Sequence, residues 1–398
     1  MMQLALLGDD DELIPLAAAA VALGHELVWV GERTQTAQLR ALAPRAVYGE
    51  SWESLLNYPQ LDGVLIGRAG PDGRAGNEEL RAEQLRKLVQ ADVHTLVVHP
   101  VAPSMLLYYE LDMIRREAHG VLQHYTPGAG HPLVEQLAVL VREGDAAAIG
   151  PVEQITCDRR LIQRDREAVL AQFARDADLL LAIAGEPDRI GALGASDDDA
   201  VYANLGIQMA CPAGPSIRWS AGPVEDAPGG RLVLIGASGK AVLQMPDEQP
   251  WSLELFRHGE PVDAPIARFD PAAAAIERWT AAIEQGDAGD DWGAACLTVE
   301  LADATVRSLA KQRTIPLHHE EFSEQATFKG TMASVGCALI LGAMALVLAA
   351  GLLGDVIGLP QGLVRLWPLA LLAVLAVFLL LQLLPGIVFS PRNRKPPR

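Results

Sequence analysis

The chain has 398 residues, a formal net charge of −18 and four cysteines. A surface that binds nucleic acid is basic, so this charge argues against nucleic acid as a partner. The cysteines lie far apart, without the spacing of a metal site or a redox pair, which is typical of a protein in a reducing cytosol.

Apolar runs and helical stretches alternate from the N-terminus to residue 125. Residues 4–7 are apolar, 14–23 are Ala-rich and helical in character, and 26–30 are apolar again. Strand, helix and strand in this order predict a βαβ unit. The alternation continues, with strands expected at 63–66, 95–98 and 121–124 and helices at 77–89 and 106–118. Residues 1–125 are therefore predicted to be α/β, a Rossmann-like, doubly wound parallel sheet of dinucleotide-binding type.

The carboxyl ends of the predicted strands are the expected place for a ligand, because doubly wound sheets bind their ligands there. The cofactor would be NAD or NADP, and Glu32 stands where an acidic side chain holds a ribose hydroxyl. The candidate cofactor-binding residues at these ends are Gly8, Asp10, Glu32, Arg68 and Pro100.

The loop after the first strand departs from the dinucleotide-binding pattern. That pattern has glycine at three places, and counted from Gly8 the second place is Asp10 and the third is Leu13. The acidic run over residues 9–12 would stabilise the start of a helix through the helix dipole, but it would also repel a bound pyrophosphate. We therefore expect dinucleotide binding to be weakened.

The order and spacing of several segments resemble the Gfo/Idh/MocA oxidoreductases, the family of glucose–fructose oxidoreductase and inositol dehydrogenase. The resemblance implies a second, α+β domain over residues 126–317 with an open, mostly antiparallel sheet. It further implies that this sheet faces a partner subunit in a homo-oligomer and that the cleft receives a sugar-like ligand. The segments that carry the resemblance are 46–66, 82–102, 136–160, 178–187, 236–239 and 295–317.

Two motifs of this family are altered in the chain. The Glu-Lys-Pro motif, whose lysine lies near the nicotinamide and the substrate, corresponds to residues 98–100, where His99 replaces the lysine. The Asp-x-x-x-His-x-x-Asp motif falls on residues 171–178, where Arg175 replaces the general acid/base histidine and Asp178 remains. By this resemblance His99, Arg175 and Asp178 are the candidate catalytic residues. Because arginine cannot accept a proton at neutral pH, we expect hydride transfer to be weakened or lost.

Several polar residues admit two interpretations. His99 could donate a proton in place of the lysine, or it could cap a strand end and bond to nearby backbone. Arg175 and the pair Arg159–Arg160 could bind an anionic ligand such as a carboxylate or phosphate, or they could neutralise acidic residues nearby. Residues 318–321, His-His-Glu-Glu, look like metal ligands, but neighbours on a strand point apart, so a polar linker over 318–331 without a metal is expected.

Two uncharged apolar stretches, residues 332–353 and 367–389, are each long enough for a helix to cross a bilayer. They predict a transmembrane hairpin over 332–389, and buried core helices of a soluble domain are the alternative. The tail over 390–398 carries four basic residues, whereas the link between the two stretches carries only Arg365. Since an excess of Lys and Arg marks the cytoplasmic side, the tail and both soluble domains are expected in the cytoplasm. The N-terminus has no basic region and does not resemble a signal peptide.

We therefore expect a membrane-anchored relative of these oxidoreductases that binds a ligand or partner without efficient redox chemistry. The alternative is a working NAD(P)-dependent oxidoreductase on a sugar or polyol derivative, with His99 in the role of the lysine.

Overall fold

The computed structural model describes residues 1–32, 37–49, 51–69, 77–128, 130–194, 202, 205–212, 214–247, 250–262, 269–286 and 291–317. Contacts divide the chain into Met1–His318 and His319–Arg398. The expected linker with its His-His-Glu-Glu run, the two expected membrane helices and the basic tail all lie outside the described residues. Within the described residues, no helix is long and apolar enough to cross a membrane.

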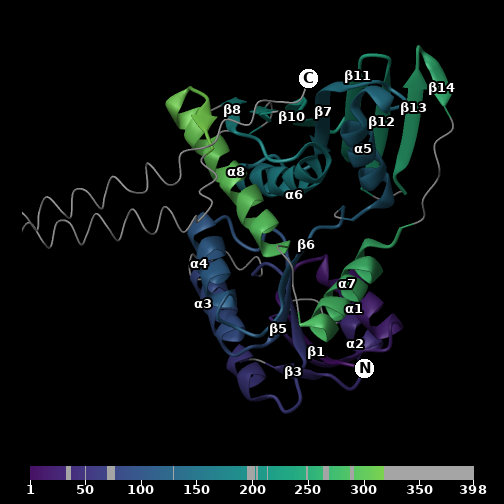
Figure 1. Ribbon diagram of the computed structural model, residues 1–398. Helices are drawn as coiled ribbons and strands as arrows, with labels where there is room; N and C mark the ends of the chain where they lie inside the picture. The colour runs from purple at the N-terminus through teal and green to yellow at the C-terminus, as the bar shows by residue number, and fades with distance from the viewer. Residues whose placement is uncertain are drawn as a thin grey trace, which may run out of the picture. The chain divides into compact units, whose positions relative to one another are not determined.

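The first sheet in the described part of the chain has six parallel strands (Figure 1). Their order is β3-β2-β1-β4-β5-β6, which is the strand order of a Rossmann-type dinucleotide-binding fold. The middle strands are buried on both faces, so they appear in the sequence as unbroken apolar runs. The predicted parallel sheet is therefore confirmed. The strands are β1 (Gln3–Leu7), β2 (Glu26–Gly31), β3 (Val47–Gly49), β4 (Gly63–Ile66), β5 (His94–Val98) and β6 (Leu122–Tyr125).

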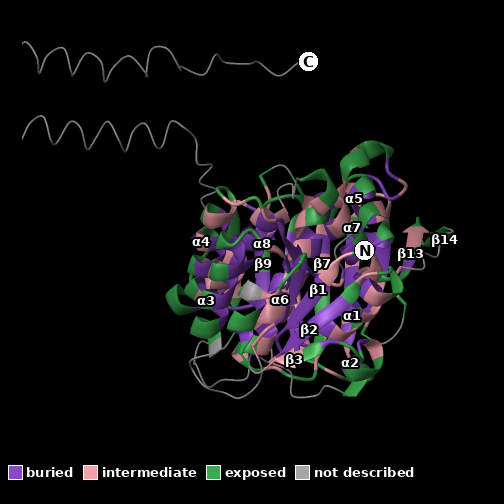
Figure 2. Ribbon diagram, turned by 90° about the horizontal axis from the view of Figure 1, so that it is seen from below, coloured by how far each residue is buried: buried purple, intermediate pink, exposed green. Residues whose placement is uncertain are grey.

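Helices cover both faces of this sheet, and Figure 2 shows the buried residues concentrated along its strands. One face packs against α1 (Leu13–Ala22), α2 (Ala37–Leu42) and α7 (Pro271–Gln285). The other packs against α3 (Asn77–Gln90), α4 (Met105–Arg115) and the first turns of α8 (Asp291–Lys311). A short 3-10 turn, Trp52–Asn57, leads into β4. We call this sheet with its helices the first lobe.

Two helices of the first lobe come from a late part of the chain. Trp279 on α7 is fully buried in the cluster that contains Leu4 and Leu6 of β1. A Cβ on Gly63 would lie 2.5 Å from the Trp279 ring, so the glycine at the start of β4 makes room for the indole. The last strand of the first sheet ends at Tyr125, but α7 and the first turns of α8, which complete the first lobe, lie within the predicted second domain over 126–317.

The second sheet has nine strands in the described residues, in the order β14-β13-β12-β11-β7-β10-β9-β8-β15. Every pair is antiparallel except β10 with β7, so the expectation of a mostly antiparallel sheet holds. The strands are β7 (Val152–Leu161), β8 (Arg189–Leu193), β9 (Gly206–Ala210), β10 (Ser216–Pro223), β11 (Gly229–Gly236), β12 (Gly239–Pro246), β13 (Ser252–Arg257), β14 (Glu260–Val262) and β15 (Ile315–Pro316).

The described helices that pack on the second sheet all lie on one of its faces. Along β10, Ile217 and Trp219 are buried while Ser216 and Arg218 are exposed, which is the alternation of a sheet with one packed face. The packed face lies against α5 (Pro132–Glu143), α6 (Arg166–Ala184) and the later turns of α8, with a 3-10 turn at Gly144–Ala146 after α5. We call this sheet with these helices the second lobe.

A buried ion pair fixes α6 against the second sheet. Arg159 on β7 donates from Nε to both carboxylate oxygens of Asp176 on α6, at 2.8 and 3.0 Å. The indole Nε1 of Trp219 donates to the same carboxylate at 2.8 Å. Arg160, the neighbour of Arg159, is 3.6 Å from Glu225 at the surface. Both arginines thus neutralise nearby acids, which is the second of the two interpretations given above.

Candidate functional site

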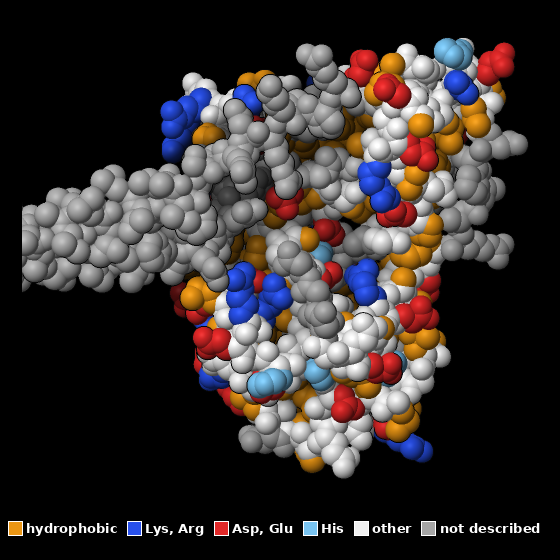
Figure 3. Space-filling view, viewed as in Figure 1, with side chains coloured by type: hydrophobic (Ala, Val, Ile, Leu, Met, Phe, Trp, Pro, Cys, Tyr) orange, Lys and Arg blue, Asp and Glu red, His pale blue; other side chains and the backbone are white. Residues whose placement is uncertain are grey.

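The carboxyl ends of the first-lobe strands face α6 of the second lobe. Figure 3 shows a hollow between the two lobes in which acidic, basic and histidine side chains gather. Two side chains of α6 bond to the strand ends. Arg175 Nε donates to the carbonyl of His99, at 3.0 Å, and Asp178 pairs with His124, at 3.2 Å. We call this region the groove.

The start of α1 holds a carboxylate of its own. Gly8 has φ +121°, and a Cβ there would lie 2.8 Å from the Arg68 carbonyl, so the tight turn requires glycine. The buried Asp10 carboxylate accepts the Glu12 amide at 3.2 Å and Arg68 Nε at 2.9 Å. Burial alone would raise the pKa of Asp10, but Arg68 and this amide hold it below its usual value. The carboxylate therefore occupies the place where a helix N-terminus binds an anion.

The two side chains that replace the loop glycines find room against β4. A Cβ on Gly67 would lie 2.5 Å from the Asp10 Cβ and 2.8 Å from the Leu13 Cδ1. The loop after β1 therefore still lies close to β4. The glycine that allows this contact is Gly67, after β4, and not a residue of the loop. The sequence pattern could not show this exchange, because Gly67 lies more than fifty residues away along the chain.

Glu32 is also engaged by the protein itself. Its carboxylate accepts Arg81 Nη2 at 2.9 Å and Gln84 Nε2 at 2.5 Å, both from α3. Arg81 is 1% exposed, and its Nη2 lies 3.1 Å from where a Cβ on Gly8 would be. Sequence reasoning missed Arg81 and Gln84, since neither belongs to a motif at a strand end.

A dinucleotide fits this edge of the sheet only in part. Glu32 stands at the end of β2, where an acidic side chain could receive a ribose hydroxyl, but the carbonyls of Gly67 and Arg68 fill the space beside Gly8. The Asp10 carboxylate does not fit a pyrophosphate at the start of α1, because two anions would compete for the same amide and the same guanidinium.

His99, the residue in the place of the family's lysine, is fully buried. Its Nδ1 is 3.1 Å from the Tyr108 hydroxyl and its Nε2 is 2.8 Å from Thr298 Oγ1. Because the Thr298 hydroxyl donates to Ala295, we assign the Nε2–H tautomer, which leaves Nδ1 to accept from Tyr108. Burial, with a smaller effect of the cation at His124, lowers the pKa of His99 to about 3. This geometry favours a structural role for His99, which forms a cis peptide bond with Pro100.

His124 forms the centre of the groove's ionisable groups. Its Nε2 is 3.2 Å from Asp178 Oδ2, and its Nδ1 is 2.9 Å from Asp291 Oδ2 at the start of α8. Burial would lower the pKa of His124, but the two carboxylates raise it to about 10. Burial would likewise raise the pKa of Asp178, but His124 lowers it to about 2. A buried imidazolium between two carboxylates is therefore the stable form at neutral pH.

Sequence reasoning found Asp178 but not its two partners. His124 lies within a strand and Asp291 lies more than a hundred residues beyond Asp178, so no spacing connects them. The available signal was the pair Gln123–His124, two polar side chains in a short strand whose four residues are all buried. Such side chains are rare in the interior unless they are bonded to something.

Arg175 lies three residues before Asp178, on the same face of α6. Burial, followed by the nearby charge of Arg68, lowers the pKa of Arg175, although a guanidinium remains charged at neutral pH. Arg68 is 38% exposed at the side chain and bonds to Asp10. The structure therefore brings Asp10, Arg68, Arg175 and Asp178 to one edge of the first sheet, while Glu32 lies at the neighbouring strand end.

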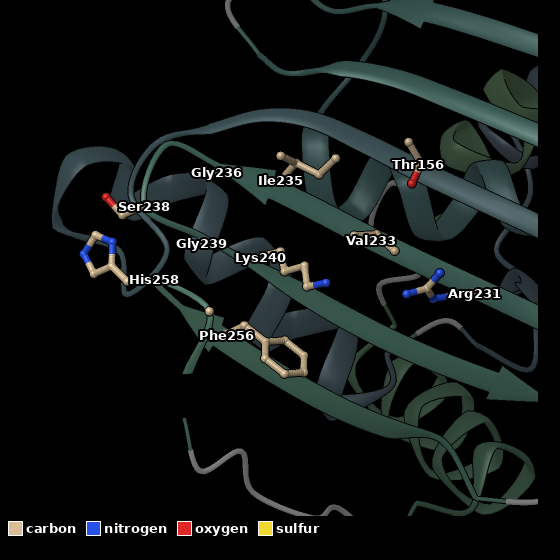
Figure 4. A pocket seen from close by; sticks show the side chains of 11 residues that line it. Thr156, Arg231, Val233, Ile235, Gly236, Ser238, Gly239, Lys240, Phe256 and His258 are labelled. Atoms are coloured by element: carbon tan, nitrogen blue, oxygen red, sulfur yellow. The ribbon is translucent and has the colours of Figure 1, made fainter. Parts of the chain in front are cut away.

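A separate hollow of about 540 Å³ lies on the open face of the second sheet, away from α6 (Figure 4). Arg231, Lys240 and Phe256 line it, and the Lys240 ammonium is 5.1 Å from the centre of the Phe256 ring. The groove and this hollow are on opposite faces of the second sheet.

Comparisons with known proteins give the fold but not an activity. No family model matches the chain, and no curated protein matches it. Myo-inositol dehydrogenase from Corynebacterium glutamicum has 18% identity and a TM-score of 0.61, over 80% of this chain and 99% of that one. KijD10, a 3-ketoreductase from Actinomadura kijaniata solved with NADP, has 16% identity and a TM-score of 0.63, over 77% and 97%. GenD2 from gentamicin A biosynthesis, solved with NAD, has 17% identity and a TM-score of 0.63, over 80% and 96%. The fold is thus that of Gfo/Idh/MocA-type oxidoreductases.

The His124 cluster predicts a specific dependence of stability on pH. Because the pKa of His124 is raised from 6.5 to about 10, its stabilising effect is complete below pH 6.5 and is lost as pH rises towards 10. His124→Gln should lower the free energy of unfolding by about 3–5 kcal/mol, since two buried carboxylates lose their cation. Thermal melting of the full chain from pH 6 to pH 10 should show a falling Tm for the parent and a flatter profile for the variant.

The matched control is His119→Gln, because the His119 side chain is 92% exposed. This variant should keep the parent's profile. A His124→Gln protein that melts with the parent's Tm and pH dependence would contradict the charged cluster.

Proposed function

We propose that the chain is an oxidoreductase that uses NAD(H) or NADP(H) on a sugar or polyol derivative. The observation that carries the proposal is the Asp178–His124–Asp291 cluster in the groove. Burying three ionisable groups costs stability, and groups with strongly shifted pKa values in a groove are typical of functional sites.

The cluster contains a cation, which the altered Glu-Lys-Pro motif lacks at residue 99. A lysine has a pKa near 10.4, and the His124 imidazolium, with a pKa of about 10, is a cation of similar acidity. The ring of His124 is 5.4 Å from the ring of His99, which stands in the lysine's place. We therefore assign the lysine's cationic role to His124 and not to His99, and we rank the working oxidoreductase above the inactive relative expected from the sequence.

Each residue of the proposed site has its own role. The Asp178 carboxylate, whose side chain is 10% exposed, would accept a hydrogen bond from a hydroxyl of the substrate. His124 would hold that carboxylate in place, and Asp291 would hold His124. Glu32 would bind the adenosine ribose of the cofactor, which when bound would supply the hydride acceptor or donor.

The solved structures support the proposal through their fold. KijD10 was crystallised with NADP and TDP-benzene, and GenD2 with NAD. By analogy, a nicotinamide cofactor and a sugar-like molecule are the ligands that we propose for this chain.

A second candidate function is the binding of a ligand or partner without hydride transfer. The specific observation in its favour is that Asp10 pairs with Arg68 and Glu32 pairs with Arg81. Both acidic groups at the dinucleotide edge are thereby held by arginines of the protein. Cofactor affinity separates the two candidates.

The oxidoreductase proposal predicts that the full chain binds NADH and that Asp10→Gly binds it at least tenfold more tightly. At about 4 Å, repulsion between two like charges is on the order of 4 kcal/mol at an intermediate effective dielectric, so loss of the Asp10 carboxylate should help the pyrophosphate. The dissociation constant would be measured by titration of nicotinamide fluorescence.

Asp11→Gly is the matched control, because Asp11 is the exposed neighbour with the same charge. Its affinity should differ little from the parent's. A parent that binds neither NADH nor NADPH up to millimolar concentration would refute the oxidoreductase and leave the second candidate in place.

We also propose that residues 332–389 anchor the protein in a membrane as a two-helix hairpin, with the described lobes and the C-terminus in the cytoplasm. The support is the length of the two apolar stretches and the excess of basic residues in the tail over the link. A soluble lobe pair tethered in this way would act on substrates close to the membrane.

The topology predicts the outcome of reporter fusions. A reporter active only in the cytoplasm should be active after Arg398 and inactive when inserted beside Gly358, in the link between the helices. The opposite pattern would reverse the orientation, and activity at both sites would show that the hairpin does not span the membrane.

We propose, finally, that two copies of the chain meet through the open face of the second sheet. This face carries apolar side chains, including Ile235, which is 40% exposed, beside the hollow with Lys240 and Phe256. Exposed apolar side chains on a sheet face are typical of protein interfaces.

Ile235→Asp should therefore convert the oligomer into a monomer, because a buried unpaired carboxylate opposes association. Light scattering of the full chain in detergent measures the mass. Leu106→Asp on α4, where the leucine is 75% exposed, should leave the mass unchanged. A parent that is already monomeric would overturn this proposal.

A further inference from the structure

One polar atom of Arg175 has no hydrogen-bond partner in the described part of the chain. Its Nε is bonded to the His99 carbonyl, but its Nη2 is buried and has no hydrogen-bond partner among the described residues. A buried donor without an acceptor is unfavourable, and most buried polar groups in folded proteins are paired. The guanidinium is thus held at the strand ends with one donor available to a ligand.

The charges around Arg175 leave room for an anion. Asp10 and Glu12 face it from the start of α1, Arg68 faces it from the end of β4, and Asp176 follows it on α6. Asp10 is bonded to Arg68, and Asp176 is bonded to Arg159 in the core of the second lobe. Glu12 is the remaining acid; burial raises its pKa, and the nearby charge of Arg175 opposes that shift.

The position of Arg175 sets what it can contact. It lies one helical turn before Asp178 on α6, so both side chains face the ends of β5 and β6. A molecule that bonds to the Asp178 carboxylate through a hydroxyl would place its neighbouring group near the guanidinium. Asp178 selects a hydroxyl, because it is ionised, and Arg175 selects an acceptor with negative charge.

We propose that the substrate carries a carboxylate, as a sugar acid does, and that Arg175 binds this carboxylate. A guanidinium matches a carboxylate through parallel N–H bonds, and the unpaired Nη2 provides one of them. The inference rests on the proposed function in placing a sugar-like ligand in the groove. It goes further in naming the class of substrate and the residue that selects it.

The test compares sugars that differ only in the carboxylate. The full chain in detergent is titrated by calorimetry with three pairs of probes: D-glucuronate and D-glucose, D-galacturonate and D-galactose, and D-mannuronate and D-mannose. At least one acid should bind tenfold or more tightly than its neutral partner. Arg175→Gln should reduce that preference to threefold or less while the neutral sugar binds as before.

Two further variants make the result specific. Arg175→Lys keeps the charge but loses the paired N–H donors of the guanidinium, so it should retain only part of the preference for the acid. If Arg175→Gln does not fold, Arg175→Lys provides the test in its place. Arg160→Gln is the matched control, because Arg160 is a half-exposed arginine near the end of β7 that pairs with Glu225. This variant should prefer the acid over the neutral sugar as strongly as the parent does.

Three outcomes would overturn the inference: no acid binds better than its neutral sugar, the preference survives Arg175→Gln, or D-glucose 6-phosphate binds more tightly than D-glucuronate through Arg175. NADH titration of the same samples keeps the two proposals apart. A carboxylate preference without NADH binding would refute the oxidoreductase and leave the sugar-acid site standing.

Discussion

Two side chains of α6 reach from the second lobe to the strand ends of the first. Asp178 pairs with His124 on β6, and Arg175 donates to the carbonyl that ends β5. The position of α6 itself depends on the buried pair of Arg159 and Asp176 behind it. Charged pairs on both sides of α6 therefore fix the geometry of the groove. A change in the Arg159–Asp176 pair would move both Arg175 and Asp178.

The same edge shows how a fold can keep its geometry while its ligand contacts change. The start of α1 still makes the tight turn at Gly8, but the anion bound there is the Asp10 carboxylate. A helix N-terminus stabilises any anion, whether it belongs to a ligand or to the chain. A dinucleotide bound at this place would therefore have to displace an internal ion pair, which would lower its affinity without altering the sheet.

The altered motifs acquire a physical meaning in this setting. A buried cation, the imidazolium of His124 between Asp178 and Asp291, lies on the strand next to His99. The histidine of the second motif becomes Arg175, which cannot transfer a proton but can bind an anion. The groove thus combines carboxylates that can accept hydrogen bonds with a guanidinium that can bind an anion.

The sequence by itself determined the parallel sheet, because strands buried on both faces must be apolar runs, such as the one over Gly63–Ile66. It also determined where the strands end, and hence that Gly8 and Glu32 lie at the carboxyl edge of the sheet. Only the tertiary structure decided that His124 and Asp291 complete the cluster and that Arg81 holds Glu32. The physical reason is that ion pairs join residues far apart in the chain, whereas periodicity and motifs report only on neighbours in sequence.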